Sequence, residues 1–277
     1  MRYPLFLSDF DGTLVRGDGT VSETTKRAIA AYRAAGGIFA VVTGRGLTSI
    51  LPRLRELGLC EGLVVAYQGA TIADIATGKL VKDDGFSRED ALKAARLLEQ
   101  DGRHVHIYTV DKLYSNMEDD ALHMYERICG VKAEIVTDMP LSELIVLKNL
   151  RIIKELAMVN KEDRRPLMEW LTPRLGEGLY VTCSSDFLVE VMPAGQSKAA
   201  AVDFLCNYYG IPRERCAAIG DQLNDLPMIA RAGGKFSVAN SEEILRRQTQ
   251  VVASVEEDGV AEALAVAMQE TSSGGAL

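Results

Sequence analysis

Short apolar runs alternate with helical patterns at both ends of this chain, and this alternation limits the fold more than any other feature. The run Ile38–Val42 is continuously apolar, which is typical of a strand covered on both faces. Further strands are predicted at Leu5–Ser8 and Leu63–Ala66, with helical spacing between the runs. The order β-α-β-α-β predicts an α/β fold with a doubly wound parallel sheet.

The same rhythm returns towards the C-terminus, with predicted helices at 197–209, 225–232 and 258–268 and strands at 217–219, 235–238 and 251–252. Residues 83–189 instead show alternating strand patterns with fewer helices, which predicts an inserted α+β domain. We expect core segments at 1–82 and 190–277 around a cap domain at 83–189, and a disordered Ser/Gly-rich tail from about 271.

Composition and charge exclude several classes of protein. A chain of 277 residues favours two domains. Lys and Arg number 31 against 39 Asp and Glu, and the net charge of −8 disfavours nucleic acid and membrane surfaces as partners. No apolar stretch approaches the roughly 18 residues of a membrane span, and the N-terminus has no signal-peptide pattern. Five scattered cysteines without a C-x-x-C pair indicate reduced thiols, so we expect a cytoplasmic protein.

Two carboxylates directly follow the first predicted strand, in the motif Asp9-Phe10-Asp11-Gly12-Thr13. Open α/β sheets place their chemistry just beyond the carboxyl ends of their strands. One carboxylate there can attack a substrate while the second moves a proton. The alternative is structural: Asp9 could cap a helix, and Asp11-Gly12 could simply form a turn.

Two further segments place polar or charged side chains at the end of a predicted strand or at the start of a predicted helix. Thr43-Gly44 follows the run Ile38–Val42 and could bind phosphate oxygens through its hydroxyl and backbone amides, or could simply cap a helix. Lys198 begins a predicted helix, where a cation interacts unfavourably with the helix dipole by about 0.3–1 kcal/mol. That misfit invites a functional explanation, although surface lysines are common at such positions.

The segment Gly220-Asp221-Gln222-Leu223-Asn224-Asp225 follows another predicted strand. Its two carboxylates and one amide are oxygen ligands suited to a hard cation such as Mg²⁺, although Asp and Asn are also common at ordinary helix N-termini. Doubly wound sheets bring the loops beyond their strands into one crevice. Side chains from all four segments are therefore expected to lie together, and the combination is more specific than its parts.

The order of these motifs resembles that of the haloacid dehalogenase superfamily, and more narrowly its Cof-type phosphatases, which carry an inserted α+β cap. The resemblance covers essentially the whole chain, including the late segment Val255–Ala261. It implies that Asp9 is the nucleophile and Asp11 the general acid and base. It further implies phosphoryl contacts from Thr43, Gly44, Lys198 and Asn224, and a Mg²⁺ ion held by Asp9, the Asp11 backbone carbonyl and Asp221, with Asp225 in support.

Two further positions relate to the family pattern. Gln68-Gly69-Ala70 stands where the family commonly has Asn-Gly-Ala, and Asn240 matches a family position near the active site. Outside the pattern, His104 and His106 lie two apart on a predicted strand and face the same side. Because no third ligand is evident, they are expected to have packing or surface roles rather than to bind a metal.

The predicted function is Mg²⁺-dependent hydrolysis of small phosphorylated metabolites, such as sugar phosphates or a phosphorylated cofactor. Asp9 would become an aspartyl-phosphate, Asp11 would protonate the leaving oxygen and then activate water, and the cap would select the leaving group. A phosphomutase with the same intermediate stays open, as does a phospho-accepting signalling module, although receiver domains have no inserted cap. An ion-pumping ATPase of this superfamily would have Lys where this chain has Phe10. A dehalogenase would lack the second carboxylate, which is present here as Asp11. The pattern specifies neither the natural substrate nor the oligomeric state.

Overall fold

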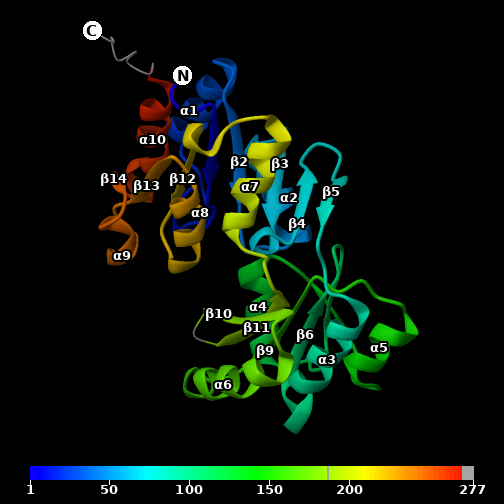
Figure 1. The fold of residues 1–277 in the computed structure, drawn as a ribbon. Coiled ribbons are helices and arrows are strands. Elements are labelled where there is room, and N and C mark those ends of the chain that lie inside the picture. Colours follow the sequence, from blue (N-terminus) through cyan, green and yellow to red (C-terminus); the bar gives the residue numbers. More distant parts are fainter. Residues whose placement is uncertain (186, 270–277) are drawn as a thin grey trace. The chain divides into compact units, whose positions relative to one another are not determined.

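The computed structural model describes residues 1–185 and 187–269, so the tail expected to be disordered lies outside the described residues. The chain divides into two compact units (Figure 1). The first unit comprises Met1–Gly44, Arg53–Val81 and Ser197–Leu277, and the second comprises Arg45–Pro52 and Lys82–Gln196. Each unit has a hydrophobic core of its own, as expected of a domain.

The first unit is built on an eight-stranded sheet in the order β14-β13-β12-β1-β2-β3-β4-β5. Its strands are β1 (Leu5–Ser8), β2 (Ile38–Val42), β3 (Leu63–Ala66), β4 (Thr71–Asp74), β5 (Leu80–Asp83), β12 (Cys216–Gly220), β13 (Gly234–Val238) and β14 (Gln250–Val252). From β14 to β3 neighbouring strands pair in parallel, and the predicted doubly wound parallel sheet is therefore confirmed. The pairing of β4 with β3 is antiparallel, an extension that the apolar pattern did not predict.

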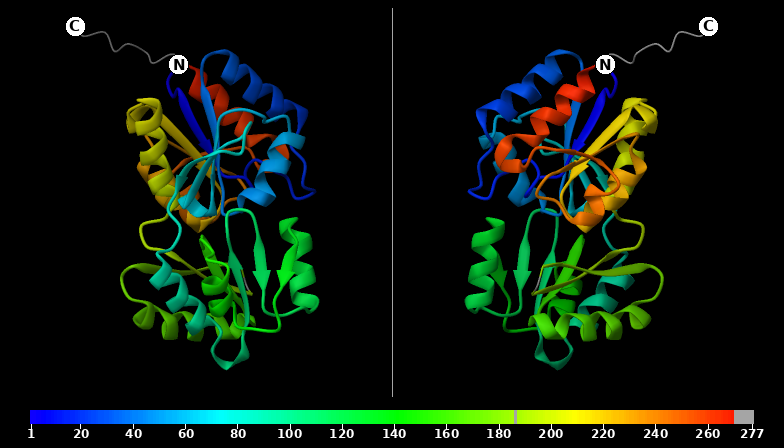
Figure 2. Two further views of the ribbon diagram at one scale, coloured as in Figure 1. Left: turned by 90° about the vertical axis from the view of Figure 1, so that its right-hand side faces the viewer. Right: turned by 90° about the vertical axis from the view of Figure 1, so that its left-hand side faces the viewer.

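Helices cover both faces of this sheet. They are α1 (Glu23–Ala34), α7 (Lys198–Tyr209), α8 (Leu226–Arg231), α9 (Glu243–Arg246) and α10 (Gly259–Met268), whereas α2 (Leu47–Glu56) is divided between the two units at Pro52. α1 packs with α10 on one face and α7 packs with α8 on the other (Figure 2). α1 begins after Ser22, whose side chain accepts a hydrogen bond from the Thr25 backbone amide. α7 ends at Gly210, whose φ of 64° lies in the left-handed region that glycine enters without a steric cost.

Strand β1 is buried on both faces because its residues alternate between two cores. Leu5 and Leu7 belong to the apolar cluster that includes residues of α7 and α8. Phe6 points the other way, where its ring stacks on Phe39 and meets Tyr32 edge-on, with ring centroids 6.1 Å apart in both pairs. Truncating such a buried aromatic ring costs about 3–5 kcal/mol, so β1 is held firmly on both sides.

The second unit contains a six-stranded sheet in the order β10-β11-β9-β6-β7-β8. Its elements are α3 (Arg88–Leu98), β6 (His104–Tyr108), β7 (Leu113–Ser115), α4 (Asp120–Cys129), β8 (Ala133–Ile135), α5 (Leu141–Leu147), β9 (Lys154–Met158), α6 (Arg164–Leu175), β10 (Leu179–Ser185) and β11 (Leu188–Pro193). All neighbouring strands pair antiparallel except β7 and β8. The second unit is therefore of the α+β type.

The two faces of the second sheet differ in polarity. Val105 and Ile107 of β6 belong to the apolar cluster that includes residues of α3, α5 and α6. His104 and His106 point to the opposite face, where both are buried and their Nε2 atoms lie 3.0 Å apart. His104 Nε2 also lies 3.0 Å from the Ser115 hydroxyl. Of the packing and surface roles expected for the two histidines, the structure therefore shows packing.

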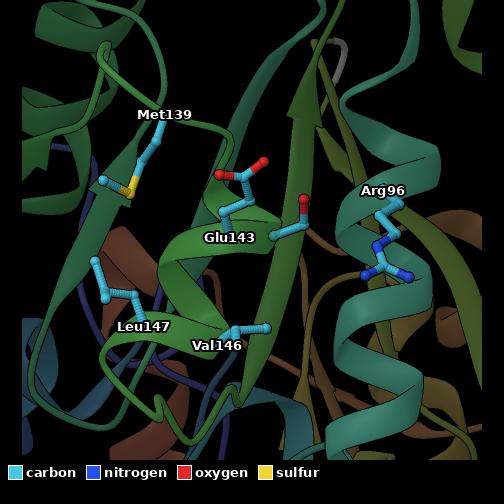
Figure 3. A pocket seen from close by; sticks show the side chains of 6 residues that line it. Arg96, Met139, Glu143, Val146 and Leu147 are labelled. Carbon is cyan, nitrogen blue, oxygen red and sulfur yellow. The ribbon is translucent and has the colours of Figure 1, made fainter.

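A hollow of about 430 Å³ lies between α3 and α5 in the second unit (Figure 3). It is lined by Arg96, Met139, Ser142, Glu143, Val146 and Leu147. These lining residues include none of the predicted site residues. Over the described ranges, no helix combines the length and the apolar character that crossing a bilayer would require.

Candidate active site

Asp9 lies one residue beyond β1, where the order of the strands reverses. β1 pairs in parallel with both β2 and β12, and the register sets Ser8 beside Val41 and Ile219. The Asp9 backbone amide donates to the Ile219 carbonyl at 3.0 Å. Residues that follow these three strands therefore emerge at one edge of the sheet, the position at which open α/β sheets bind their ligands.

Three carboxylates converge at this edge. One carboxylate oxygen from each of Asp9, Asp221 and Asp225 lies within 4.8 Å of the other two, and all three residues are buried. Lys198 reaches the group from the first turn of α7 and is 1% exposed. Its Nζ donates to Asp9 Oδ1 at 2.5 Å and to Asp225 Oδ1 at 2.6 Å. The structure thus brings together side chains from three of the four segments singled out in the sequence.

The group carries more negative charge than its lysine offsets. Three carboxylates and one ammonium leave two net negative charges when all are ionised. Burial raises the pKa of Asp9 well above its usual range, and although Lys198 opposes this, Asp225 and Asp221 raise it further. Burial likewise raises the pKa of Asp221, against the hydrogen bond from Thr13.

Lys198 itself stays charged. Burial alone would lower its pKa, but the nearby carboxylates of Asp9 and Asp225 outweigh that effect and raise the pKa above its ordinary value. The remaining negative charge matches the donor chemistry of a divalent cation, because carboxylate oxygens are the ligands that Mg²⁺ prefers.

Hydrogen bonds hold the two carboxylates that follow β12. Asp221 Oδ1 accepts from the Thr13 hydroxyl at 2.9 Å, and Asp221 Oδ2 accepts from Gln222 Nε2 at 3.2 Å. Asp225 Oδ2 accepts from the backbone amides of Asp221 and Gln222 at 2.9 and 3.0 Å. The sequence pattern predicts no role for Thr13 or Gln222, although Thr13 belongs to the first motif.

Two glycines permit the close approach of these segments. A Cβ on Gly12 would lie 2.6 Å from Asp221 Oδ2, and the φ of Gly12 is +77°. A Cβ on Gly220 would lie 2.4 Å from the Asp225 side chain. Both distances are too short for a real Cβ, so glycine is required at both positions for the acidic group to form.

Asp11 differs from Asp9 in its exposure. The ring of Phe10 is buried, and the Phe10 carbonyl accepts from the backbone amides of Leu14 and Val15 at 3.0 and 2.8 Å. This compact turn places Asp11 at the surface, where it is exposed, whereas Asp9 is 7% exposed. The first motif therefore supplies one carboxylate from the interior and one from the solvent side.

The remaining predicted residues lie beyond β2 and β12. Thr43 is buried, and its backbone amide donates to the Val65 carbonyl at 2.9 Å. A Cβ on Gly44 would lie 2.6 Å from Gln68 Nε2, and Asn224 Nδ2 donates to Gln68 Oε1 at 3.5 Å. Gln68, the position that departs from the family pattern, therefore connects the two segments predicted to bind phosphate. Its φ of 57° is unusual for a residue other than glycine.

Comparisons with known proteins bear on the family and the fold of this chain. A family model described as haloacid dehalogenase-like hydrolase matches residues 6–264. The chain is 25% identical over 262 residues to the 5-amino-6-(5-phospho-D-ribitylamino)uracil phosphatase YitU of Bacillus subtilis, covering 93% of this chain and 94% of that protein. It is 27% identical over 243 residues to the HMP-PP phosphatase of Escherichia fergusonii, covering 87% and 85%. The crystal structure of TM0651 from Thermotoga maritima matches with a TM-score of 0.86 at 24% identity, over 97% and 98% of the two chains, which shows a shared fold.

Proposed function

Because this chain belongs to the haloacid dehalogenase-like hydrolase family, as its motifs predicted, we propose that it is a Mg²⁺-dependent phosphatase, a phosphoric monoester hydrolase of small phosphorylated metabolites. The similar proteins are named for phosphatase activity on such molecules, an aminouracil phosphate and HMP-PP. The buried group of Asp9, Asp221, Asp225 and Lys198 is the observation that carries the proposal.

The hydrogen bonds within the group distinguish ligands from supporting residues. Asp225 gives one oxygen to the Lys198 ammonium and the other to two backbone amides, whereas each oxygen of Asp221 accepts from one side-chain donor, Thr13 or Gln222, and keeps a lone pair for a cation. Asp225 therefore suits a supporting role, and the Mg²⁺ ligands would be Asp9, Asp221 and the Asp11 backbone carbonyl. When bound there, Mg²⁺ would offset the negative charge shared by the nucleophile and the phosphate.

Asp9 is the proposed nucleophile. Lys198 holds one of its oxygens and Asp9 is buried, so the carboxylate is oriented before substrate arrives. An oxygen of Asp9 forms a bond to phosphorus while the bond from phosphorus to the leaving oxygen breaks. Asp11 gives its proton to that oxygen. Asp11 then takes a proton from the water that attacks the aspartyl-phosphate, which releases inorganic phosphate and restores Asp9.

The phosphoryl oxygens require donors beyond the metal. The Lys198 ammonium lies next to Asp9 and can stabilise the charge that develops on these oxygens. We assign the Thr43 hydroxyl and the Gly44 amide to the same task from their position just past β2. Asn224, in the short 3₁₀ helix Leu223–Asp225, is the fourth proposed contact.

Replacement of the nucleophile tests the proposal. Asp9→Asn is expected to lower phosphate release from p-nitrophenyl phosphate by about 10³-fold or more, because the amide cannot form the covalent intermediate. Asp18→Asn is the matched control, because Asp18 is an exposed residue of the same unit. The activity of the Asp18→Asn variant should equal that of the unsubstituted protein. Near-normal turnover by Asp9→Asn with a native circular dichroism spectrum would refute the assignment.

A further inference from the structure

Asn240 holds the turn that carries Asp11. Asn240 Nδ2 donates to the Gly12 carbonyl at 2.9 Å, across 228 residues of sequence. Its Oδ1 accepts from the Val255 backbone amide, also at 2.9 Å. Because both ends of the side-chain amide are engaged, Asn240 links the turn after β1 to the segment that precedes α10.

The same segment holds the chain just beyond the turn. Arg16 Nη2 donates at 2.9 Å to both Asp258 Oδ1 and the Glu256 carbonyl, and the Gly17 backbone amide donates to Glu256 Oε1 at 3.1 Å. Asp258 also accepts from the Ser22 hydroxyl at 2.5 Å. The φ of Asp258 is 67°, in the left-handed region. A residue other than glycine keeps such a conformation where its surroundings fix it, and these positions cluster near functional sites.

The inner side of the turn has no room to move. A Cβ on Gly12 would already lie 2.6 Å from Asp221 Oδ2, and the Thr13 hydroxyl donates to Asp221 Oδ1. Gly12 therefore lies between Asp221 on one side and Asn240 on the other. Asp11 precedes Gly12 in the same turn, so the backbone of the turn sets the direction in which the exposed Asp11 side chain leaves the chain. A displaced Gly12 carbonyl would rotate the Gly12–Thr13 peptide and change the backbone dihedral angles of Gly12, the residue that follows Asp11.

We infer that Asn240 is a positioning residue for Asp11: its hydrogen bond to the Gly12 carbonyl aims the Asp11 carboxyl at the leaving-group oxygen. This inference rests on the proposed function, in which Asp11 supplies the proton. Asn240 itself touches neither the substrate nor the reacting atoms in this role. The segment 255–258 anchors it through Val255 and fixes the neighbouring Arg16 and Gly17.

A comparison of leaving groups tests the inference. Proton donation assists the departure of an alcohol far more than that of an acidic phenol. Asn240→Ala is therefore expected to lower kcat/KM for an aliphatic sugar phosphate by about ten-fold and kcat/KM for p-nitrophenyl phosphate by less than about two-fold. For each substrate, kcat/KM reports only the steps up to loss of the leaving group. The later hydrolysis of the aspartyl-phosphate therefore does not affect the comparison of the two substrates.

Three variants serve as references. Asp11→Asn defines the selective loss expected when the proton donor is removed. Asn240→Asp keeps the acceptor for the Val255 amide but has no donor for the Gly12 carbonyl, and it should also lose activity selectively on the sugar phosphate. Asn207→Ala, at an exposed asparagine of α7 in the same unit, should leave both values unchanged.

The outcomes separate this inference from the proposed function. If Asp11→Asn shows the selective loss and Asn240→Ala loses activity equally on both substrates, or on neither, the role of Asn240 is overturned. A crystal structure of Asn240→Ala with Asp11 and the Gly12 carbonyl unmoved would overturn it as well. If Asp11→Asn shows no selective loss, the proposed function of Asp11 fails, and the inference fails with it.

Discussion

Replacement of Lys198 by methionine is the most direct test of the buried charge group. Methionine keeps much of the length of the side chain and removes the cation that both Asp9 and Asp225 contact. Two charge-assisted hydrogen bonds are lost, each worth about 1.5–3 kcal/mol. Removing one partner of a buried ion pair typically costs about 3–5 kcal/mol, which agrees with that sum. Lys198 is 1% exposed, so solvent screening does not reduce the cost.

The loss of stability is expected to depend on pH. The folded-state pKa values of Asp9 and Asp221 are raised, so these carboxyls bind more protons in the folded than in the unfolded protein. Their contribution is fully present below the unfolded pKa of about 3.9 and is lost as the pH rises through the folded values. Removing Lys198 raises the folded values further. The destabilisation should therefore be small near pH 5 and approach about 3–5 kcal/mol near pH 8.

Urea unfolding in EDTA, followed by far-ultraviolet circular dichroism between about pH 5 and about pH 8, measures this difference. Lys235→Met is the matched control, because Lys235 is exposed on β13 of the same unit. Under the proposed function Mg²⁺ would bind the folded state through its excess negative charge, so added Mg²⁺ should restore part of the lost stability. Equal stability of Lys198→Met and the unsubstituted protein near pH 8 would refute this account of the charge group.

Three further changes have outcomes that follow from the structure. Glu155 is fully buried, and neither of its carboxylate oxygens has a hydrogen-bond partner within the described part of the chain. Burial raises the pKa of Glu155 well above its usual range, so Glu155→Met should raise the unfolding midpoint of the second unit, read from Trp170 fluorescence, and more so near pH 8 than near pH 5. Gly12→Ala should lower kcat/KM by about ten-fold or more, because the new Cβ would displace Asp221. EDTA should abolish phosphate release, and Asp221→Asn should raise the Mg²⁺ concentration that restores half of it. An unshifted Trp170 transition, normal activity of Gly12→Ala, or turnover independent of Mg²⁺ would contradict these predictions in turn.

The centre of the first sheet could be predicted from the sequence because its strands are apolar on both faces. The runs Ile38–Val42 and Leu63–Ala66 coincide with β2 and β3, since helices cover such strands and leave little choice of position. The edge of the sheet could not be predicted in this way. β5 (Leu80–Asp83) is partly exposed along its length, so its apolar pattern is too weak to distinguish a strand from a loop.

The residues of the candidate site could be predicted where carboxylate side chains directly follow a predicted strand. Asp9 and Asp221 follow β1 and β12, and topology alone brings such residues to one edge. The contacts that complete the site have no such local signal. Thr13 and Asn240 contact partners more than 200 residues away in sequence, and these contacts depend on the close approach of Gly12 to Asp221. A single sequence shows which residue types stand at these positions, but it does not show which residues contact one another.

The position of Lys198 shows why a local misfit can be informative. At the start of α7 its charge opposes the helix dipole at a cost of about 0.3–1 kcal/mol. The two buried carboxylates that it contacts are worth several times more, about 3–5 kcal/mol when the pair is broken. The tertiary contact therefore outweighs the local rule, and the misfit is a consequence of the charge that the site must hold. Two negative charges remain on the group when all of its carboxylates are ionised, so the lysine orients Asp9 without neutralising the site.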